Sequence, residues 1–293
     1  MTTITAKVIA RSTARNRLPI TTVLVRYPLI IHAELMTHRV FSRNAASMRA
    51  IPFDKLVKAT IDDPFVPLIW TKNRPGMQGY QELDVSAATA AKAIWLEAMH
   101  AAIFHAKRLH RIDVHKQIVN RLLMPYAHIT VLITSTYWAN WFALRRHPKA
   151  EPHIQILAGK MFDAIEATPP RFLHDGQWHL PFVGLEDMAK ERLAFGDQLR
   201  LSVARCASTS YRTVDGFEMS PDRADQVFES LIGDAPIHAS PLEHQAQADR
   251  VLDIDGGRIV WDKPGLNGNL SPGWIQYRKT LANEFIQDTV GGY

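Results

Sequence analysis

The sequence has few of the features that stabilise a secreted protein or hold a protein in a membrane. Its 293 residues include a single cysteine, Cys206, which excludes an internal disulfide framework and is typical of a reducing compartment. No apolar run approaches the roughly 20 residues that a membrane-spanning helix needs. The first residues lack the charged start and apolar core of a signal peptide. We therefore expect a cytoplasmic protein.

Charge of one sign is not in large excess either. The 34 basic and 29 acidic residues leave a formal net charge of +5, and the two signs are interspersed. This balance favours anionic ligands such as nucleotides or folates through long-range attraction, but it is too small to predict nucleic acid as a partner. Low-complexity segments and repeats are also missing, and a chain with 46% hydrophobic residues can bury a large core.

Hydrophobic patterns predict a mixed α/β protein. Alternating, β-branched segments favour strands at Ile4–Ala10 and Ile20–Arg26, and an apolar run favours a buried strand at Ile129–Thr134. The stretch Ile51–Gly79, rich in Pro, Asp and Gly, is expected to be a surface loop. Helices are expected at Pro28–Thr37, Asp84–Arg111, His115–Met124, Tyr137–Arg146, Pro152–Ala167, Leu185–Tyr211, Ser220–Ile232 and Trp274–Phe285.

A dense group of hydrogen-bond donors follows the first expected helix. From Met36 to Arg49 the chain places three arginines, a histidine, two serines and an asparagine within fourteen residues. Arginine suits a phosphate because its planar fork donates two parallel charge-assisted hydrogen bonds. Residues 36–49, named here the signature segment, therefore predict an anion site. Standing alone, the segment would be explained better by a solvated basic turn.

The signature segment resembles the motif of flavin-dependent thymidylate synthases, which runs Arg-His-Arg and then Ser, Asn, Ser and Arg at fixed offsets. Three positions depart from that motif. Thr37 replaces its first arginine, Ala45 replaces the acidic residue after the asparagine, and Glu34 replaces a glutamine upstream. The matching residues are His38, Arg39, Ser42, Asn44, Ser47 and Arg49.

A second block, residues 121–145, resembles the same family. The family order is an arginine, a proline, a strand and an Asn-x-x-x-Leu-Arg helix. Singly, Arg121 and Arg145 would be ordinary cations at helix ends, but their order with the other residues favours a site. Residues 134–136 stand where the family carries a further Asn and Arg. The matching residues are Arg121, Pro125, Ile129–Thr134, Asn140, Leu144 and Arg145.

A third block resembles the family but lies out of its usual order. Family members begin with Ala-Ala-Arg-x-Ser or Cys, then a helix and a Gly-His-x-Ser-Pro-x-Glu-His loop. Here Val203–Ser208 and Ile237–His244 follow the second block. A circular permutation explains this order, since termini often lie close together and surface loops tolerate cuts. It predicts a joint near residues 169–181 and one pocket shared by His244 and Arg39.

The resemblance implies a fold, an activity and a set of ligands. The fold would be a single α/β (α+β) domain, residues 1–248, with a large antiparallel sheet flanked by long helices and followed by an extension of unknown role, residues 249–293. The activity would be reductive methylation of dUMP to dTMP. FAD would be the cofactor, NADPH and methylene-tetrahydrofolate the co-substrates, and a homotetramer the assembly.

The resemblance also assigns roles to residues. Catalytic roles fall to Arg145 and His38, and Arg145 would also contact the pyrimidine ring. Substrate binding falls to Ser47, Arg49, Arg121, Arg145 and Glu34, the first three at the phosphate. Cofactor binding falls to Arg39, Asn44, Asn140, His244 and Ser208.

Two alternatives stay open. The same scaffold could hydroxymethylate C5 or use dCMP, because the Glu34 carboxylate can accept a hydrogen bond from an exocyclic amine but repels a uracil carbonyl. The chain could also be a non-catalytic protein that binds nucleotides or nucleic acid. Cys206 is interpreted as core. No metal site is predicted, because pairs such as His110 and His115 lack the Cys or carboxylate that would complete a ligand set.

Overall fold

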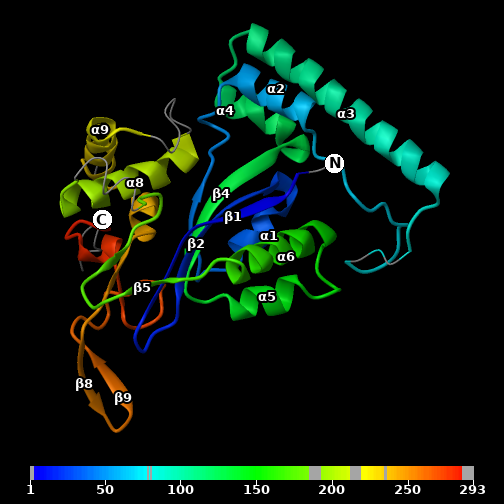
Figure 1. The fold of residues 1–293 in the computed structure, drawn as a ribbon. Coiled ribbons are helices and arrows are strands. Elements are labelled where there is room, and N and C mark those ends of the chain that lie inside the picture. Colours follow the sequence, from blue (N-terminus) through cyan, green and yellow to red (C-terminus); the bar gives the residue numbers. More distant parts are fainter. Residues whose placement is uncertain are drawn as a thin grey trace, which may run out of the picture.

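A five-stranded sheet forms the centre of the computed structural model, which describes residues 3–77, 79, 81–184, 193–211, 219–233 and 236–285 (Figure 1). The strand order is β3-β4-β2-β1-β5, and every pairing is antiparallel except that of β1 with β5. The predicted mixed α/β fold with an antiparallel sheet is thus confirmed. The strands are β1 (Thr5–Ala14), β2 (Ile20–Pro28), β3 (Ser42–Ala45), β4 (His128–Ser135) and β5 (Arg171–Leu173).

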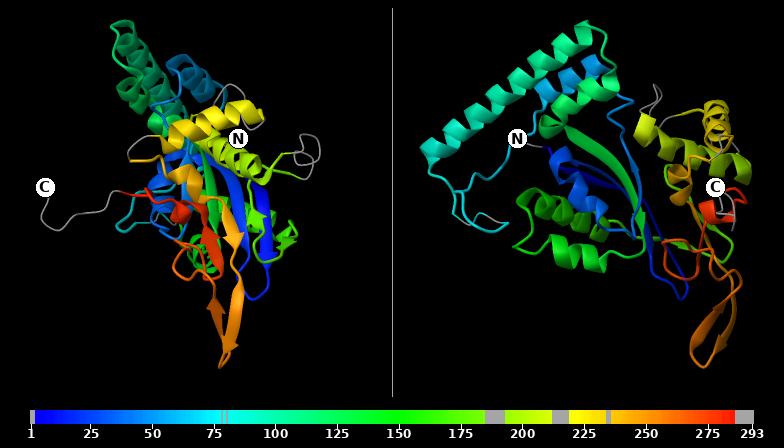
Figure 2. Two further views of the ribbon diagram at one scale, coloured as in Figure 1. Left: turned by 90° about the vertical axis from the view of Figure 1, so that its left-hand side faces the viewer. Right: turned by 180° about the vertical axis from the view of Figure 1, so that it is seen from behind.

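One face of this sheet is apolar and is covered by helices. Successive side chains of a strand point to opposite faces, and Val25 on β2 and Val131 on β4 share a buried cluster with α6 (Pro152–Glu166). Glu151 caps α6 by accepting hydrogen bonds from two backbone N–H groups of its first turn. The helices α1 (His32–Met36) and α5 (Ala139–Arg145) lie on the same side (Figure 2). The helices expected at residues 137–146 and 152–167 are therefore confirmed, and the one expected at 28–37 is confirmed as the 3-10 helix Leu29–Ile31 followed by α1.

A layer of helices lies at one end of the sheet (Figure 1). Its longest member is α3 (Val85–Arg111), which confirms the helix expected at Asp84–Arg111 and has Asp84 as its N-cap. Beside it lie α2 (Phe53–Asp62), α4 (Lys116–Val119) and the 3-10 helix Asn120–Tyr126. The helix α2 shows that the loop expected over Ile51–Gly79 was wrong at Phe53–Asp62, whereas the described residues from 63 to 79 belong to no helix or strand of the fold. Its apolar residues recur at helical spacing and are buried near α3, a period that the prolines and glycines further along the segment obscured.

The other side of the sheet is covered by α8 (Phe195–Tyr211), α9 (Pro221–Ile232) and a small second sheet (Figures 1 and 2). The helix expected over Leu185–Tyr211 is confirmed from Phe195 onward, while residues 185–192 lie outside the described residues. The helix expected at Ser220–Ile232 is confirmed as α9, and Ser220 caps it by accepting a hydrogen bond from the backbone N–H of Arg223. The strands of the second sheet are β6 (Trp178–His179), β7 (Ala246–Ala248) and β10 (Trp274–Gln276).

The helix expected at Trp274–Phe285 was wrong. Trp274–Gln276 is the strand β10, which pairs with β7, and only Tyr277–Thr280 forms a short 3-10 helix. The strand pairing wins because it buries Trp274 and Ile275. It also joins residues on the two sides of position 248, where the sequence suggested a domain boundary; that boundary stays a prediction.

A two-stranded hairpin, β8 (Val251–Asp255) and β9 (Arg258–Trp261), projects from the rest of the molecule (Figures 1 and 2). Gly256 and Gly257 have positive φ angles of 55° and 83°, which suits a tight two-residue turn. Among the described residues, no helix combines the length and the apolar character needed to cross a membrane.

Candidate functional site

Three hydroxyl side chains form a row on the sheet face opposite α6. Ser42 on β3, Thr134 on β4 and Thr22 on β2 stand opposite one another in the strand register, and all three are buried. Cross-strand neighbours lie about 5 Å apart. The three side chains are named here the hydroxyl row. Each of their hydroxyl groups forms a hydrogen bond with a residue beyond position 170 in the sequence. The row therefore joins distant parts of the chain.

Two buried histidines continue the hydroxyl row. His244 Nδ1 lies 2.8 Å from Thr134 Oγ1, which lies 2.6 Å from Thr22 Oγ1. His179 Nε2 lies 2.9 Å from Thr22 Oγ1, and its Nδ1 lies 2.9 Å from Ser12 Oγ. Burial lowers the pKa of His244 to about 3. Burial is also the main cause that lowers the pKa of His179 to about 3. Both rings are therefore neutral near pH 7. His244 Nε2 is buried with no hydrogen-bond partner in the described part of the chain.

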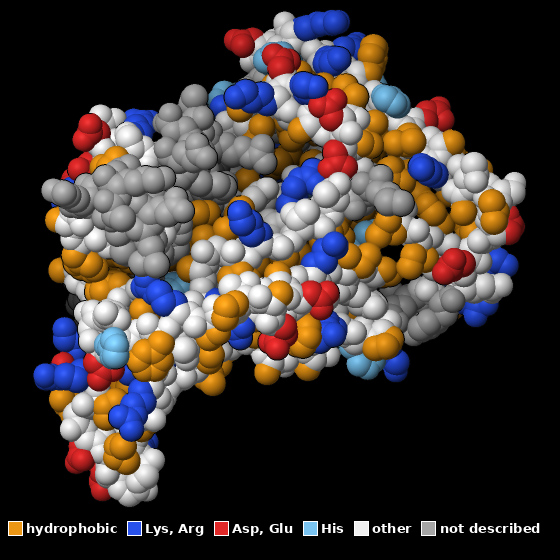
Figure 3. Space-filling model, viewed as in Figure 1, with side chains coloured by type: hydrophobic (Ala, Val, Ile, Leu, Met, Phe, Trp, Pro, Cys, Tyr) orange, Lys and Arg blue, Asp and Glu red, His pale blue; other side chains and the backbone are white. Residues whose placement is uncertain are grey.

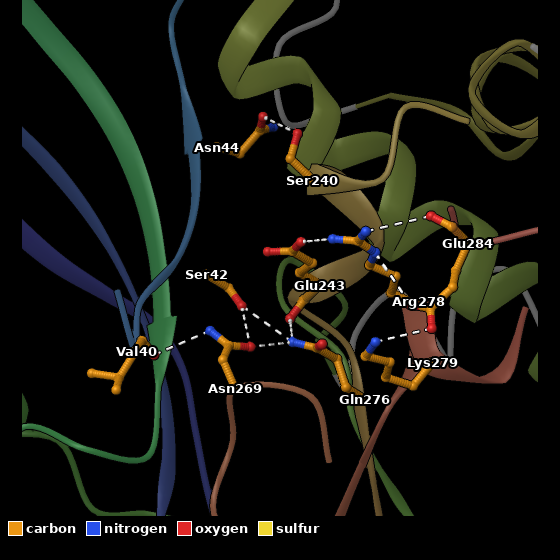
Figure 4. Close-up of polar contacts among 10 residues, drawn as sticks. All are labelled: Val40, Ser42, Asn44, Ser240, Glu243, Asn269, Gln276, Arg278, Lys279 and Glu284. Carbon is orange, nitrogen blue, oxygen red and sulfur yellow. Dashed lines mark hydrogen bonds and ion pairs between the residues drawn. The ribbon is translucent and has the colours of Figure 1, made fainter. Parts of the chain in front are cut away.

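Asn44 connects the signature segment with the third block. Its Nδ2 donates to the backbone carbonyl of Cys206 in α8 at 2.6 Å. Its Oδ1 accepts from Ser240 Oγ at 3.3 Å (Figure 4). Ser208, the last residue of the segment Val203–Ser208 in the third block, is buried. Its Oγ donates to the backbone carbonyl of Ala204, one helical turn earlier. Cys206 itself is buried, and burial raises the pKa of its thiol well above the ordinary value, in agreement with a core role.

Sequence reasoning missed two residues that hold the signature segment from the far end of the chain (Figure 4). The Nε2 of Gln276 lies 3.2 Å from Ser42 Oγ, 2.8 Å from Asn269 Oδ1 and 3.0 Å from the backbone carbonyl of Glu243. Gly268 makes room for it, because a Cβ at this position would come within 2.1 Å of Gln276 Oε1. Neither Gln276 nor Asn269 belongs to a motif, so no local signal in the sequence marks them.

Arg145 gathers a second cluster where α5 meets α1. Its Nε donates to His38 Nε2 at 3.0 Å, and its Nη1 donates to Glu34 Oε2 at 3.2 Å. Nη2 of Arg145 donates to Thr37 Oγ1 at 3.2 Å. Burial, and then the charge of Arg145, lower the pKa of His38. A neutral ring that accepts at Nε2 carries its proton on Nδ1. These four residues, named here the Arg145 cluster, join the first block to the second.

The residues predicted at the phosphate lie on two segments that Asn120 ties together. Its Nδ2 donates to the backbone carbonyls of Met48 at 2.7 Å and Ile51 at 3.0 Å, so the end of the signature segment lies against the turn that carries Arg121. Arg49 and Arg121 are exposed there. Ser47 Oγ is half-buried and accepts from the backbone N–H of Arg49 at 3.3 Å. Asn120, too, was not foreseen from the sequence.

A comparison with known protein families identifies the family of this chain. The profile described as "Thymidylate synthase complementing protein" matches residues 12–171, more than half of the chain. The chain belongs to the thymidylate synthase complementing protein family. This confirms the family resemblance drawn from the signature segment and the second block, which both lie within the match. The third block lies beyond residue 171, so the circular permutation stays a prediction.

Solved structures similar to this family member include two of the UMP/dUMP methylase PolB from Streptomyces cacaoi. The one bound with 5-Br UMP is 18% identical, covers 56% of this chain and 89% of that chain, and has a TM-score of 0.46. The one bound with 5-Br dUMP is 17% identical, with 56% and 90% covered and a TM-score of 0.46. Flavin-dependent thymidylate synthase ThyX from Helicobacter pylori, complexed with FAD and dUMP, is 18% identical, with 50% and 67% covered and a TM-score of 0.32. No curated protein matches the chain significantly.

The remaining predicted site residues of this family member differ from His244 in exposure. Arg39, on the turn after α1, and Asn140, in the first turn of α5, are both exposed, whereas His244 is fully buried. The pocket expected to hold Arg39 and His244 together stays a prediction. Within the described ranges, no group of three or more His, Cys, Asp or Glu residues could hold a metal ion.

Proposed function

We propose that this protein is a flavin-dependent enzyme that methylates dUMP at C5, with methylene-tetrahydrofolate as the one-carbon donor and NADPH as the reductant. Membership of the family supports the class of enzyme. The observation that carries the proposal is the Arg145 cluster. In it, the last residue of the second block contacts His38 of the signature segment, as expected if one site is assembled from both blocks.

The Arg145 cluster suits the activation of a pyrimidine. Arg145 is oriented before substrate arrives, since Glu34 and His38 accept from two of its nitrogens. Its side chain is 20% exposed, so part of the guanidinium can reach a ligand. A fixed cation beside a pyrimidine carbonyl stabilises the negative charge that develops on the ring as C5 attacks the one-carbon unit. In the proposal Arg145 has this role, and the neutral His38 holds it without adding a competing charge.

The exposed cations beside Asn120 suit the phosphate of the nucleotide. Arg49 and Arg121 each carry a guanidinium that can bind two phosphate oxygens, and Ser47 adds a hydroxyl. Their exposure fits a ligand that arrives from solvent. In the proposal these three residues hold the phosphate while Arg145 holds the base.

His244 and Gln245 each have a buried polar atom that a flavin could satisfy. His244 Nε2 and Gln245 Oε1 are buried without a hydrogen-bond partner in the described part of the chain, and a flavin ring edge offers both donors and acceptors. In the proposal His244 contacts the ring, Asn44 and Ser208 brace the wall behind it, and Arg39 and Asn140 bind the cofactor from the surface. Bound FAD, once reduced by NADPH, would supply the hydride that reduces the one-carbon unit to a methyl group.

We also propose that the protein works as a homo-oligomer, a homotetramer as in the family resemblance. Hydrophobic side chains gather on the surface between α3 and the body below it (Figure 3). Large exposed patches of this kind usually mark contact surfaces. Exposed apolar residues of α3 and of the segments before it include Ile61, Leu68, Ile69, Val85, Ile94 and Phe104.

Mass spectrometry of the nucleotide product tests the proposed reaction. The purified protein is incubated with FAD, NADPH, methylene-tetrahydrofolate and dUMP. We expect dTMP to form, to require every component, and to vanish in Arg145→Ala. Binding of FAD and dUMP without any turnover would overturn the proposed reaction and favour the nucleotide-binding alternative.

Glu34 favours a second candidate, an enzyme that modifies dCMP. Its Oε2 lies 3.2 Å from Arg145 Nη1, so a carboxylate acceptor stands beside guanidinium donors. The base-pairing edge of cytosine presents two acceptors and then an amine donor, so the acceptors can face the guanidinium and the amine can face the carboxylate. The edge of uracil places its N–H between two acceptors and does not match this arrangement.

The same assay with dCMP distinguishes the two substrates, and the product mass distinguishes a methyl from a hydroxymethyl group. If Glu34 selects cytosine, Glu34→Gln should shift turnover toward dUMP. A wild-type protein that uses dUMP and ignores dCMP removes this candidate.

A further inference from the structure

A continuous chain of hydrogen bonds runs through the interior from β1 to the end of the third block. It links Ser12, His179, Thr22, Thr134 and His244 through contacts of 2.9, 2.9, 2.6 and 2.8 Å. All five side chains are at most 3% exposed. The family resemblance assigns no role to Ser12, His179 or Thr22. The chain ends at His244 Nε2, a buried nitrogen without a partner in the described part of the protein.

The protons of this chain have two complete arrangements. Each hydroxyl donates once, and each neutral imidazole has one N–H. In the first arrangement Thr134 donates to His244 and Thr22 donates to Thr134, so both histidines carry their proton on Nε2. In the second arrangement every bond is reversed, and both histidines carry it on Nδ1. Each arrangement makes the same four internal hydrogen bonds and leaves one proton on each ring.

Unequal tautomers break the chain. If His244 carries its proton on Nε2 and His179 on Nδ1, both threonine hydroxyls donate outward and no proton lies between their oxygens, which are 2.6 Å apart. If the two tautomers are exchanged, both threonines accept from the rings and one hydroxyl proton has no acceptor within the chain. The first case loses the hydrogen bond between the threonines, whereas the second keeps four bonds but leaves a threonine O–H inside the chain without an acceptor; both are costly in a buried place.

We propose that these five side chains form a tautomer relay that keeps His179 and His244 in the same tautomer. The relay lets His244 Nε2 act as a donor or as an acceptor with no loss of internal hydrogen bonds. Ser12, Thr22 and His179 are positioning residues in it. Together they decide what His244 offers to a ligand.

The use of such a relay toward a cofactor rests on the proposed function. A flavin ring nitrogen such as N5 accepts a hydrogen bond when the flavin is oxidised and donates one when it is reduced. A histidine locked in one tautomer would suit only one of these states. A contact that can reverse suits both, so a His244 served by the relay fits a cofactor that alternates between them.

Nuclear magnetic resonance of the full chain labelled with ¹⁵N-histidine tests the relay without any ligand. Correlations between ring nitrogens and ring protons show which nitrogen of each imidazole is protonated, and His179→Gln and His244→Gln assign the signals. We expect His179 and His244 to have the same tautomer. Opposite tautomers in the wild-type protein would overturn the relay.

A pair of variants tests the coupling between the two rings. Thr22→Val keeps the shape of the side chain and removes its hydroxyl, whereas Thr22→Ser keeps the hydroxyl. Loss of the hydroxyl must affect His179, which bonds to it directly. The relay predicts that the ring signals of His244, beyond Thr134, also change in Thr22→Val and stay near wild type in Thr22→Ser. Unchanged His244 signals in a folded Thr22→Val protein would contradict the relay.

Titration with FAD separates the relay from the proposed function. Binding is followed by flavin fluorescence, independently of the histidine signals. If FAD alters the His244 ring, the His179 ring should change with it in wild type and Thr22→Ser but not in Thr22→Val; a change at His244 alone in wild type overturns the relay. Failure of FAD to bind counts against the proposed function, and the ligand-free measurements still decide the relay.

Discussion

Glu34, Thr37 and Ala45 depart from the family motif, and each has a physical reason in its surroundings. Thr37 accepts from Arg145 and donates to the backbone carbonyl of Glu34 at 2.7 Å; an arginine there would place a second cation beside Arg145. Glu34 supplies the carboxylate that neutralises Arg145. Ala45 packs against the core under the sheet, where an acidic side chain would lose its hydration.

Residues of the site could be predicted only where a motif marks them. The family resemblance predicts His38 and Arg145, and the structure brings their side chains together. Gln276 and His179 could not be chosen, because their partners lie 234 and 157 positions away, at Ser42 and Thr22. A polar residue buried by a distant strand looks no different in sequence from one that is exposed.

The exposed cation Arg49 gives a prediction at this scale. Replacing it by alanine should weaken dUMP binding by roughly ten- to a hundredfold, since a hydrogen bond to a charged group contributes about 1.5–3 kcal/mol. The fold should be unaffected, because the side chain is exposed. Calorimetric titration measures the affinity. Arg258→Ala on the projecting hairpin, also exposed, is the control and should bind as wild type; equal affinity in both variants would place the phosphate elsewhere.

The carboxamide of Gln276 gives a second prediction. Gln276→Ala should lower the free energy of unfolding by about 2–4 kcal/mol, because buried groups of Ser42 and Glu243 lose their donor. Urea unfolding followed by circular dichroism provides the measurement. Gln247→Ala, on the neighbouring strand β7, removes one exposed bond to Gly176 and should cost less than about 0.5 kcal/mol. Similar losses in the two variants would mean that burial of the Gln276 bonds contributes little.

At the scale of elements, the sequence was informative where structure is local. The helices α3 and α6 begin at residues that cap them, Asp84 and Glu151, and the apolar residues of α6 recur at helical spacing. The error at Trp274–Phe285 came where tertiary pairing decides. The strand β10 forms because β7 is beside it, and neither β7 nor its position can be inferred from Trp274–Gln276 alone.

The cap of α9 provides a prediction about an element. Ser220 Oγ accepts from the backbone N–H of Arg223 at 3.4 Å. Ser220→Ala should therefore lower the free energy of unfolding by about 1 kcal/mol. Ser230→Ala, an exposed serine in the last turns of the same helix, lacks this role and should change stability by less than about 0.5 kcal/mol. Thermal unfolding of the two variants compares them; a larger loss in Ser230→Ala would refute the capping role.

At the scale of the whole molecule, buried neutral histidines make stability depend on pH. The pKa values of His179 and His244 lie near 3 in the folded protein, below the value of about 6.5 expected when unfolded. The unfolded chain therefore binds more protons between these values. The stability from these groups is fully present above pH 6.5 and is lost as the pH falls toward 3.

Acid unfolding checks this argument. Each of the two histidines should lower the free energy of unfolding by roughly 2 kcal/mol at pH 5 relative to neutral pH. Denaturant unfolding at several pH values gives the slope. In His179→Gln the slope below pH 6 should fall by about one proton, whatever the stability at neutral pH. An unchanged slope would mean that His179 is protonated in the folded protein.

The contacts of Gln276 also bear on how the protein is made. A ribosome adds Ser42 early, and Asn269 and Gln276 follow only 227 and 234 positions later. Until then, Ser42 of the nascent signature segment lacks its hydrogen-bond partners Asn269 and Gln276. A chain stalled before residue 276 would carry the whole signature segment and the second block, yet this part of the site would remain unassembled. Completion of the site is therefore a late event in biosynthesis.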